Sequence, residues 1–248
     1  ARSIHQRRLQ TMAETGTLIL ANSEDSKQRF LAYCAEHQLS QPPVHTLLIG
    51  VEASMLKAAT ELALPLPTRI QPKIDRPYFI TIGTIEARKN HLLLLQIWRQ
   101  LAEELKDNCP QLVILGKRGW NIEGTIHLLD KCPALQNNHV VEINDATDQD
   151  MIALIQHARA LLFPSFAEGW GMPLAEALTL GTPAICSDIP ALRECGQNQA
   201  IYLDPLDGLG WKQTMISFLS EISKKPHYRP DQWQTHLLAL DRLLLNLE

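Results

Sequence analysis

The chain has 248 residues, of which 45% are hydrophobic and 20% are charged. This composition is typical of a globular protein with a sizeable core, and it excludes a disordered, collagenous or coiled-coil chain. The 23 lysine and arginine residues against 27 aspartate and glutamate residues give a formal net charge of -4. Because no long basic run accompanies this acidic balance, we expect no nucleic-acid polymer as a partner.

The apolar runs and the cysteines indicate the cellular compartment. The longest apolar stretches fall far short of the roughly 18 to 20 residues that cross a bilayer, so we expect no transmembrane segment. The five cysteines are scattered and odd in number, without the close pairs of a disulfide framework or a zinc site. We therefore expect reduced thiols and a cytoplasmic protein. The first residue is alanine and the opening pattern reads like the end of a helix, so we expect part of a longer polypeptide.

The first quarter of the chain predicts a short βαβ segment. Residues 18–21 and 44–49 read as strands, and residues 24–37 read as a helix that begins after the capping residue Ser23. Residues 50–77 then lose periodicity and contain four prolines. This stretch favours an interdomain connector over a packed element.

From residue 78 onward, short apolar runs alternate regularly with helical patterns. The predicted strands span residues 78–82, 111–115, 140–143, 160–163, 182–187 and 200–203. The predicted helices span residues 89–106, 122–129, 149–158, 172–180, 190–195, 209–222 and 232–247. The alternation predicts an α/β fold with a Rossmann-like, doubly wound parallel sheet. Ligands of such sheets bind outside the carboxyl ends of the strands, so the loops there should share one crevice.

The most informative loop leads from the strand at residues 160–163 into the helix that begins at Met172. Gly171 lets the backbone approach a ligand closely, and Pro173 suits the first turn of a helix, where its missing N–H costs nothing. We expect the N–H groups of Gly171, Met172 and Leu174 to be unpaired and to point out of the helix start. Such a terminus predicts a seat for a diphosphate.

Two carboxylates flank this helix start. Glu168 lies in the loop and Glu176 lies in the first turn of the helix. A pair with this spacing often arises by chance, and the helix dipole alone favours an acidic residue in a first turn. The surrounding Gly-x-Gly-x-Pro pattern favours a functional interpretation, in which the two carboxylates face different parts of one ligand.

A second constellation follows the strand at residues 78–82. Arg88 and Lys89 are adjacent at the predicted start of the next helix, where cations oppose the macrodipole. An anion would offset this cost, so we expect the pair to neutralise a diphosphate leaving group without a metal. The alternative is that both are solvated residues on a helix surface.

Three stretches together resemble a family 4 retaining glycosyltransferase of the GT-B fold, in which two Rossmann-like domains face each other. They are residues 83–90, the E-x7-E pattern from Glu168 to Glu176, and residues 181–194. The resemblance covers about residues 78–219, and residues 17–52 resemble the closing βαβ of the family's N-terminal domain.

The resemblance implies a division of the chain into four parts. Residues 1–52 would be the last portion of the N-terminal, acceptor-side domain, and residues 53–77 a linker. Residues 78–222 would form the donor-binding domain, and residues 223–248 a tail with a helix that crosses back to the N-terminal domain.

The same resemblance assigns the site. Arg88 and Lys89 would bind the donor diphosphate, Glu168 would contact the transferred sugar, and Glu176 would accept hydrogen bonds from the ribose hydroxyls. The predicted catalytic residues are Arg88, Lys89 and Glu168. The donor-binding set consists of Gly83, Lys117, Ile143, Asn144, Gly169, Trp170, Gly171, Met172, Pro173, Leu174 and Glu176. No metal site is expected.

The implied reaction is the retaining, metal-independent transfer of a hexose from a nucleoside diphosphate sugar to a glycan or lipid-linked acceptor, in polysaccharide or cell-envelope biosynthesis. The nucleotide sugar is a co-substrate, no further cofactor is expected, and a UDP-sugar is favoured over a GDP-sugar. The alternatives are a GDP-mannose-dependent mannosyltransferase, another GT-B enzyme such as a nucleotide-sugar epimerase or a sugar phosphorylase, and a non-catalytic nucleotide-binding module. Peripheral membrane contact would come from the rest of the polypeptide.

Overall fold

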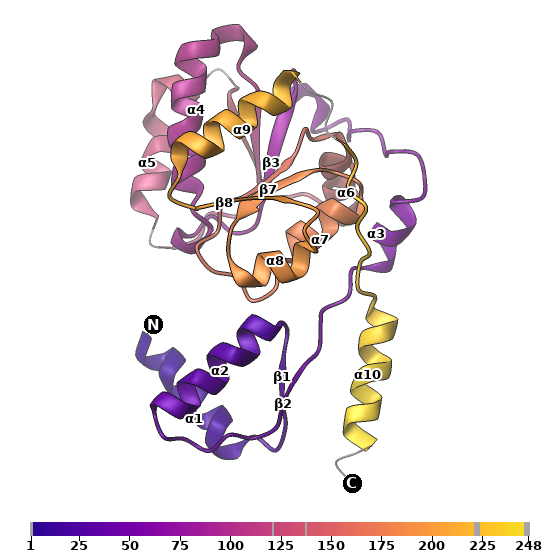
Figure 1. The fold of residues 1–248 in the computed structure, drawn as a ribbon. Helices are drawn as coiled ribbons and strands as arrows, with labels where there is room; N and C mark the ends of the chain where they lie inside the picture. Colours follow the sequence, from indigo (N-terminus) through magenta and orange to yellow (C-terminus); the bar gives the residue numbers. More distant parts are fainter. Residues whose placement is uncertain (1, 121, 137, 221–223, 246–248) are drawn as a thin grey trace.

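The computed structural model describes residues 2–120, 122–136, 138–220 and 224–245. They form two units that follow one another along the chain (Figure 1). The smaller, N-terminal unit contains helix α1 (Arg2–Thr15), strand β1 (Ile19–Ala21), helix α2 (Glu24–Glu36) and strand β2 (Val44–Thr46). Its two strands are parallel. The Ser23 side chain caps α2 by accepting the N–H of Ser26 at 3.0 Å, as the sequence predicts.

The larger unit is built on one parallel sheet. Its strands are β3 (Tyr78–Ile82), β4 (Gln111–Leu115), β5 (Val140–Ile143), β6 (Leu161–Phe163), β7 (Ala184–Ser187) and β8 (Ile201–Leu203). Their order across the sheet is β5-β4-β3-β6-β7-β8. The chain thus starts in the middle, winds out to β5, and returns to begin again at β6, so the switch point lies between β3 and β6. The expected doubly wound α/β fold is confirmed.

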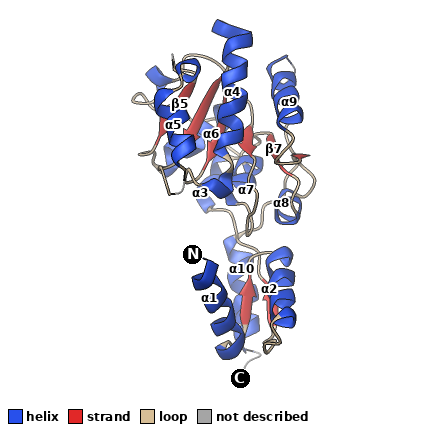
Figure 2. Cartoon of the chain, turned by 90° about the vertical axis from the view of Figure 1, so that its left-hand side faces the viewer, coloured by secondary structure: helices blue, strands red, loops and turns tan. Residues whose placement is uncertain are grey.

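Helices cover both faces of this sheet (Figure 2). One face packs against α4 (His91–Leu105), α5 (Glu123–Lys131) and α9 (Gly208–Ser220). The other packs against α3 (Ala53–Ala58), α6 (Asp148–His157), α7 (Met172–Thr179) and α8 (Pro190–Gly196). Short 3-10 turns span Gln71–Lys73, Ala87–Lys89, Lys106–Asn108 and Pro133–Leu135, and helix α10 spans Trp233–Leu245. The predicted helix ends at residues 222 and 247 lie outside the described residues.

The strands are continuous apolar runs because both faces are covered. Along β3, Tyr78 and Ile80 enter the core beneath α6 and α7, whereas Phe79 enters the core beneath α4 and α9. All three side chains are nearly inaccessible, with exposed fractions of 3%, 0% and 0%. The two cores fix the sheet between its helical layers, and so fix the loops at its carboxyl edge.

Residues 53–77 differ from the unpacked connector that the sequence predicts. Met55 and Ala58 of α3 and Ile70 join the core beneath α7, with exposed fractions of 2%, 7% and 1%. The expectation of a segment without packed elements was wrong, because a helix of six residues is too short to show a helical period. The domain boundaries themselves stay a prediction.

Two segments of the chain connect the units, and they cross closely where Gly50 meets Trp233. A Cβ built on Gly50 would lie 2.1 Å from the backbone nitrogen of Trp233, so only glycine allows the crossing. Beyond it, α10 runs alongside the smaller unit, where a ring nitrogen of His236 lies 2.8 Å from the Leu48 carbonyl (Figures 1 and 2). In the described part of the chain, no helix is both long enough and apolar enough to span a membrane.

Candidate active site

The loop after β3 places two cations at the switch point. The backbone turns at Gly83, which has a φ of 131°, and residues Ala87–Lys89 form a 3-10 turn. Asn90 then takes a left-handed conformation with a φ of 55°, and α4 begins at His91. The predicted helix start at residue 89 is therefore wrong by two residues, because a left-handed residue interrupts a right-handed helix. Arg88 and Lys89 lie in the turn before the helix.

Both cations bind the same carboxylate. Arg88 Nη1 lies 2.8 Å from Glu168 Oε2, and Lys89 Nζ lies 2.8 Å from Glu168 Oε1. Arg88 Nη2 also lies 2.6 Å from Glu86 Oε1. The side chains of Glu168 and Lys89 are only 8% and 11% exposed, so their ion pair is largely desolvated, whereas Arg88 is 43% exposed. We refer to Glu86, Arg88, Lys89 and Glu168 as the ion-pair cluster; its two cations and two carboxylates balance.

The loop after β6 brings Glu168 to this cluster through backbone contacts. The N–H of Phe166 donates to the carbonyl of Arg88 at 2.9 Å, and Arg88 Nη1 donates to the carbonyl of Ala167 at 2.8 Å. Because β3 and β6 are neighbours in the sheet, their following loops meet at one edge. The predicted catalytic residues Arg88, Lys89 and Glu168 therefore lie together.

Lys89 reaches from the cluster toward a pocket. A Cβ built on Gly83 would lie 3.3 Å from Lys89 Cε, so a side chain there would crowd the lysine. The ammonium group also sits 4.6 Å from the centre of the Phe163 ring, a cation–π distance. The glycine keeps the path open between the lysine and the pocket that Gly83 itself lines.

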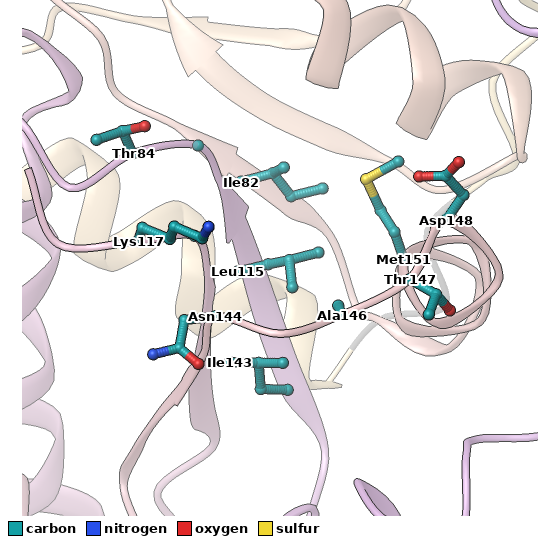
Figure 3. A pocket seen from close by; sticks show the side chains of 12 residues that line it. Ile82, Thr84, Leu115, Lys117, Ile143, Asn144, Ala146, Thr147, Asp148 and Met151 are labelled. Carbon is teal, nitrogen blue, oxygen red and sulfur yellow. The ribbon is translucent and has the colours of Figure 1, made fainter.

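This pocket of about 270 Å³ lies at the carboxyl ends of β3, β4 and β5, where the sequence predicts donor-binding residues, and we call it the donor pocket (Figure 3). The predicted residues Gly83, Lys117, Ile143 and Asn144 all line it. Figure 3 shows Lys117 and Asn144 on one side of it and Asp148 and Met151 on the other. The remaining lining residues are Ile82, Thr84, Leu115, Gly116, Ala146 and Thr147.

The start of α7 provides fewer free amides than the sequence predicts. Gly171 caps the helix with a φ of 111°, and a Cβ there would lie 2.6 Å from Leu192 Cδ2. The N–H of Leu174 donates to the Gly171 carbonyl at 2.9 Å, so the expectation of an unpaired Leu174 amide was wrong. The cap carbonyl accepts this bond in the first turn. Within the described residues, the N–H groups of Gly171 and Met172 have no acceptor.

The side chains of the predicted loop separate into two groups. Trp170 and Leu174 are 3% and 0% exposed and pack into the core beneath α7, so only their backbone could face a ligand. Gly169, Met172 and Pro173 are partly exposed. A donor would therefore meet this loop chiefly through main-chain groups.

Glu176 is the fifth residue of α7, so the expectation that it lies in the first turn was wrong, because a turn of about 3.6 residues from Met172 ends before it. Burial, with the negative charges of Asp148 and Glu52, raises the pKa of the Glu176 carboxyl to about 7. Asp148 lines the donor pocket on the side opposite Lys117, whereas Glu176 itself is not among the lining residues (Figure 3). Within the described part of the chain, no group of three or more side chains could hold a metal ion.

The smaller unit also contacts the donor loop, through residues that the sequence did not single out. Ser26 Oγ donates to the Gly169 carbonyl at 3.3 Å, and a Cβ on Gly169 would lie 2.8 Å from the Asn22 amide nitrogen. Both carboxylate oxygens of Glu194 accept the N–H of Glu24 at 2.9 Å, at the start of α2. A capping pattern at Ser23 signals the helix start, but no local signal relates residues this far apart in the sequence.

The strand order and the glycine turns define a doubly wound α/β domain, whose switch point here carries two cations. The family described as "Glycosyl transferases group 1" matches residues 68–207, more than half of the chain. The chain therefore belongs to this family, which confirms the expected resemblance.

Curated relatives resemble nearly the whole chain. A "Serotype-specific mannosyltransferase WbdA" from Escherichia coli is 32% identical over 246 residues, which cover 96% of this chain and 30% of the relative. An "O-antigen chain mannosyltransferase B" from the same organism is 33% identical over 130 residues, or 52% of this chain and 33% of the relative. The chain thus spans about a third of the length of these relatives.

Solved structures share the fold. A sucrose-phosphate synthase from Thermosynechococcus elongatus superimposes with a TM-score of 0.72 at 17% identity, covering 99% of this chain and 62% of that one. A trehalose 6-phosphate synthase from Burkholderia multivorans gives 0.69 at 13% identity, covering 89% and 54%. These neighbours are GT-B glycosyltransferases, so the GT-B architecture is confirmed.

Proposed function

We propose that the chain is the donor-binding part of a glycosyltransferase that transfers mannose from a nucleoside diphosphate sugar to a glycan or lipid-linked acceptor in polysaccharide biosynthesis. The observation that carries this proposal is the meeting of Arg88, Lys89 and Glu168 at the switch point, beside a pocket, in a chain of this family. The mannosyltransferase relatives support mannose. They favour the GDP-mannose alternative over the UDP-sugar that the sequence reading preferred.

In this proposal the ion-pair cluster opens when the donor binds. Arg88 and Lys89 are held by carboxylates, so a diphosphate must take over one or more of these contacts. Two phosphate groups carry more charge than one carboxylate, and the guanidinium fork suits their oxygens. The exchange would release Glu168 to accept hydroxyls of the sugar. As the bond to the diphosphate breaks, the two cations would stabilise the leaving charge.

The same geometry supports retention without a protein nucleophile. Once the cations pass to the diphosphate, the Glu168 carboxylate would accept hydroxyls of the sugar, which holds it beside the ring rather than in line with the anomeric carbon. We therefore assign the carboxylate to orienting the sugar. The proton of the acceptor hydroxyl would pass to the leaving diphosphate on the same face, and no metal takes part in this scheme.

Glu176 would bind the ribose of the donor. A carboxylate accepts two hydroxyl donors at once, which suits a diol. With a pKa near 7, Glu176 is only partly ionised at neutral pH, and accepting two hydrogen bonds favours its ionised form. The base would lie between the loops at Lys117 and Asn144, which line the donor pocket.

Calorimetric titration of the chain tests this proposal. We expect GDP and GDP-mannose to bind, UDP and UDP-glucose to bind more weakly, and Lys89→Ala to abolish the GDP signal. Stronger binding of UDP-sugars would restore the UDP alternative. Failure of every nucleotide to bind would instead favour a non-catalytic module that binds a partner. Transfer itself would be measured in a full-length enzyme, because the chain spans about a third of its relatives.

A further inference from the structure

Two hollows along α5 lie outside the donor pocket. One, of about 290 Å³, lies between the 3-10 turn at Ala87–Lys89, the start of α5 and Phe166. The other, of about 590 Å³, lies between Trp120 and the outer face of α5. Ile122 and Glu123 line both, so the two hollows adjoin. We refer to them together as the α5 groove.

The α5 groove carries two exposed aromatic side chains. Trp120 is 67% exposed and Phe166 is 46% exposed. By contrast, Trp98, Trp170 and Trp211 are at most 3% exposed. A large aromatic side chain left in water forgoes its burial free energy, and such residues beside a groove are typical of recognition surfaces.

The two residues before Trp120 are tied to neighbouring elements. The preceding residue, Gly119, donates its N–H to the Ile85 carbonyl at 2.9 Å, and a Cβ there would lie 2.8 Å from the same oxygen. Arg118 in turn holds the carboxylate of Asp130 on α5 at 2.7 Å. The loop before Trp120 is therefore tied to the β3 loop and to α5, so the groove is built in advance of any ligand.

The inner end of the α5 groove touches the ion-pair cluster. Glu86 lines this end and accepts a hydrogen bond from Arg88 at 2.6 Å. Phe166 lines it too, and its N–H donates to the Arg88 carbonyl. A chain lying in the groove would thus lead toward the place where the proposed transfer occurs.

The polar lining selects the chemistry of the occupant. Glu123, Asp130 and Lys131 supply charges of both signs, and His127 adds a further polar ring. Such a mixture does not suit a polyanion, which collects arginines and lysines. A pyranose has apolar C–H faces that stack on aromatic rings and hydroxyls that pair with carboxylates. Aromatic rings next to carboxylates therefore fit a neutral sugar chain.

We propose that the α5 groove binds an oligosaccharide: the residues of the acceptor chain beyond the sugar that receives the transfer. This inference rests on the proposed function, because only a glycan acceptor brings such a chain to the site. It assigns to the donor-binding unit a share of acceptor recognition, with Trp120 as a stacking platform at the outer end.

Titration of the chain with neutral mannose oligosaccharides, from a disaccharide upward and without donor, tests this proposal. We expect affinity to rise with length in the original chain. Trp120→Ala should lower the affinity for the longest oligosaccharide by about tenfold, or about 1.4 kcal/mol. Trp120→Phe should keep most of it. The control is Leu206→Ala, which removes a side chain that is 78% exposed elsewhere on the surface and should change nothing.

The outcomes separate the two proposals. Two results would overturn the proposal for the α5 groove and leave the proposed function standing. One is binding of GDP-mannose without binding of oligosaccharides. The other is equal oligosaccharide affinity in the original chain and in Trp120→Ala. Loss of self-association in Trp120→Ala without any glycan binding would also overturn it, in favour of a protein contact. In a full-length enzyme, Trp120→Ala should raise KM for long acceptors more than it raises KM for short ones.

Discussion

The two glutamates of the proposed donor site, Glu168 and Glu176, lie in opposite environments. At the switch point, Glu168 lies between Arg88 and Lys89, both 2.8 Å away. Within α7, burial and the negative charges of Asp148 and Glu52 raise the pKa of Glu176 to about 7. Under the proposed function, the first environment exchanges one anion for another, whereas the second accepts neutral hydroxyls.

The largest effect is expected at the ion-pair cluster. Arg88→Ala in a full-length enzyme should lower kcat/KM by about two orders of magnitude, the range for losing one donor to a developing negative charge. Steady-state kinetics would measure it. Arg29→Ala is the matched control, since Arg29 also pairs with a carboxylate, Asp25 at 2.8 Å, but on α2. Equal losses in both variants would contradict a specific role for Arg88.

A smaller effect of opposite sign is expected when the competing carboxylate is neutralised. Glu168→Gln leaves Arg88 and Lys89 with less negative charge to pair with, so GDP should bind about tenfold more tightly in calorimetry. Turnover of the full-length enzyme should nevertheless fall, because the sugar loses its anchor. Glu104→Gln, near the far end of α4, is the control. Unchanged GDP affinity in Glu168→Gln would show that the diphosphate does not displace this ion pair.

Glu176→Gln should change how the stability of the folded chain depends on pH. Below about pH 4.5 the carboxyl is neutral in both states. Between pH 4.5 and 7 the folded state stays protonated while the unfolded state ionises, so the folded chain loses stability as the pH rises. Glutamine removes this loss, on the order of 3 kcal/mol at pH 8. Thermal melts should therefore show a raised Tm at pH 8 and little change at pH 4.

The smallest effect is expected where the two units meet. Glu194→Gln removes the charge that faces the start of α2, a loss of about 0.5 to 1 kcal/mol. Hydrogen exchange of the Glu24 amide should become several-fold faster, because a free-energy change of about 1.4 kcal/mol alters an equilibrium constant about tenfold. GDP affinity should not change. Unaltered exchange at Glu24 would mean that this contact does not hold the units together in solution.

Much of this site could be predicted from local patterns. The strands ending at Ile82 and Phe163 are apolar runs, and the rule for doubly wound sheets brings their following loops together. Arg88, Lys89 and Glu168 meet for that reason. Likewise, glycines at residues 83 and 171 adopt positive φ angles where the backbone turns.

Other features depend on tertiary contacts that leave no local trace. Trp170 lies in a glycine loop, yet its ring is buried in the core beneath α7. The short helix α3 packs on the core although its sequence shows no period. The pairing of Glu194 with the start of α2 joins residues 170 positions apart. Each of these follows from which surfaces meet, and a single sequence does not record that.

A crystal structure of the chain with bound GDP tests the central claim most directly. The account predicts the base and ribose in the donor pocket near Asn144 and Glu176, with phosphate oxygens within hydrogen-bond distance of Arg88 and Lys89. At least one of their present contacts with Glu168 should be broken. A nucleotide whose phosphates lie away from both cations, with the Glu168 ion pairs intact, would contradict it.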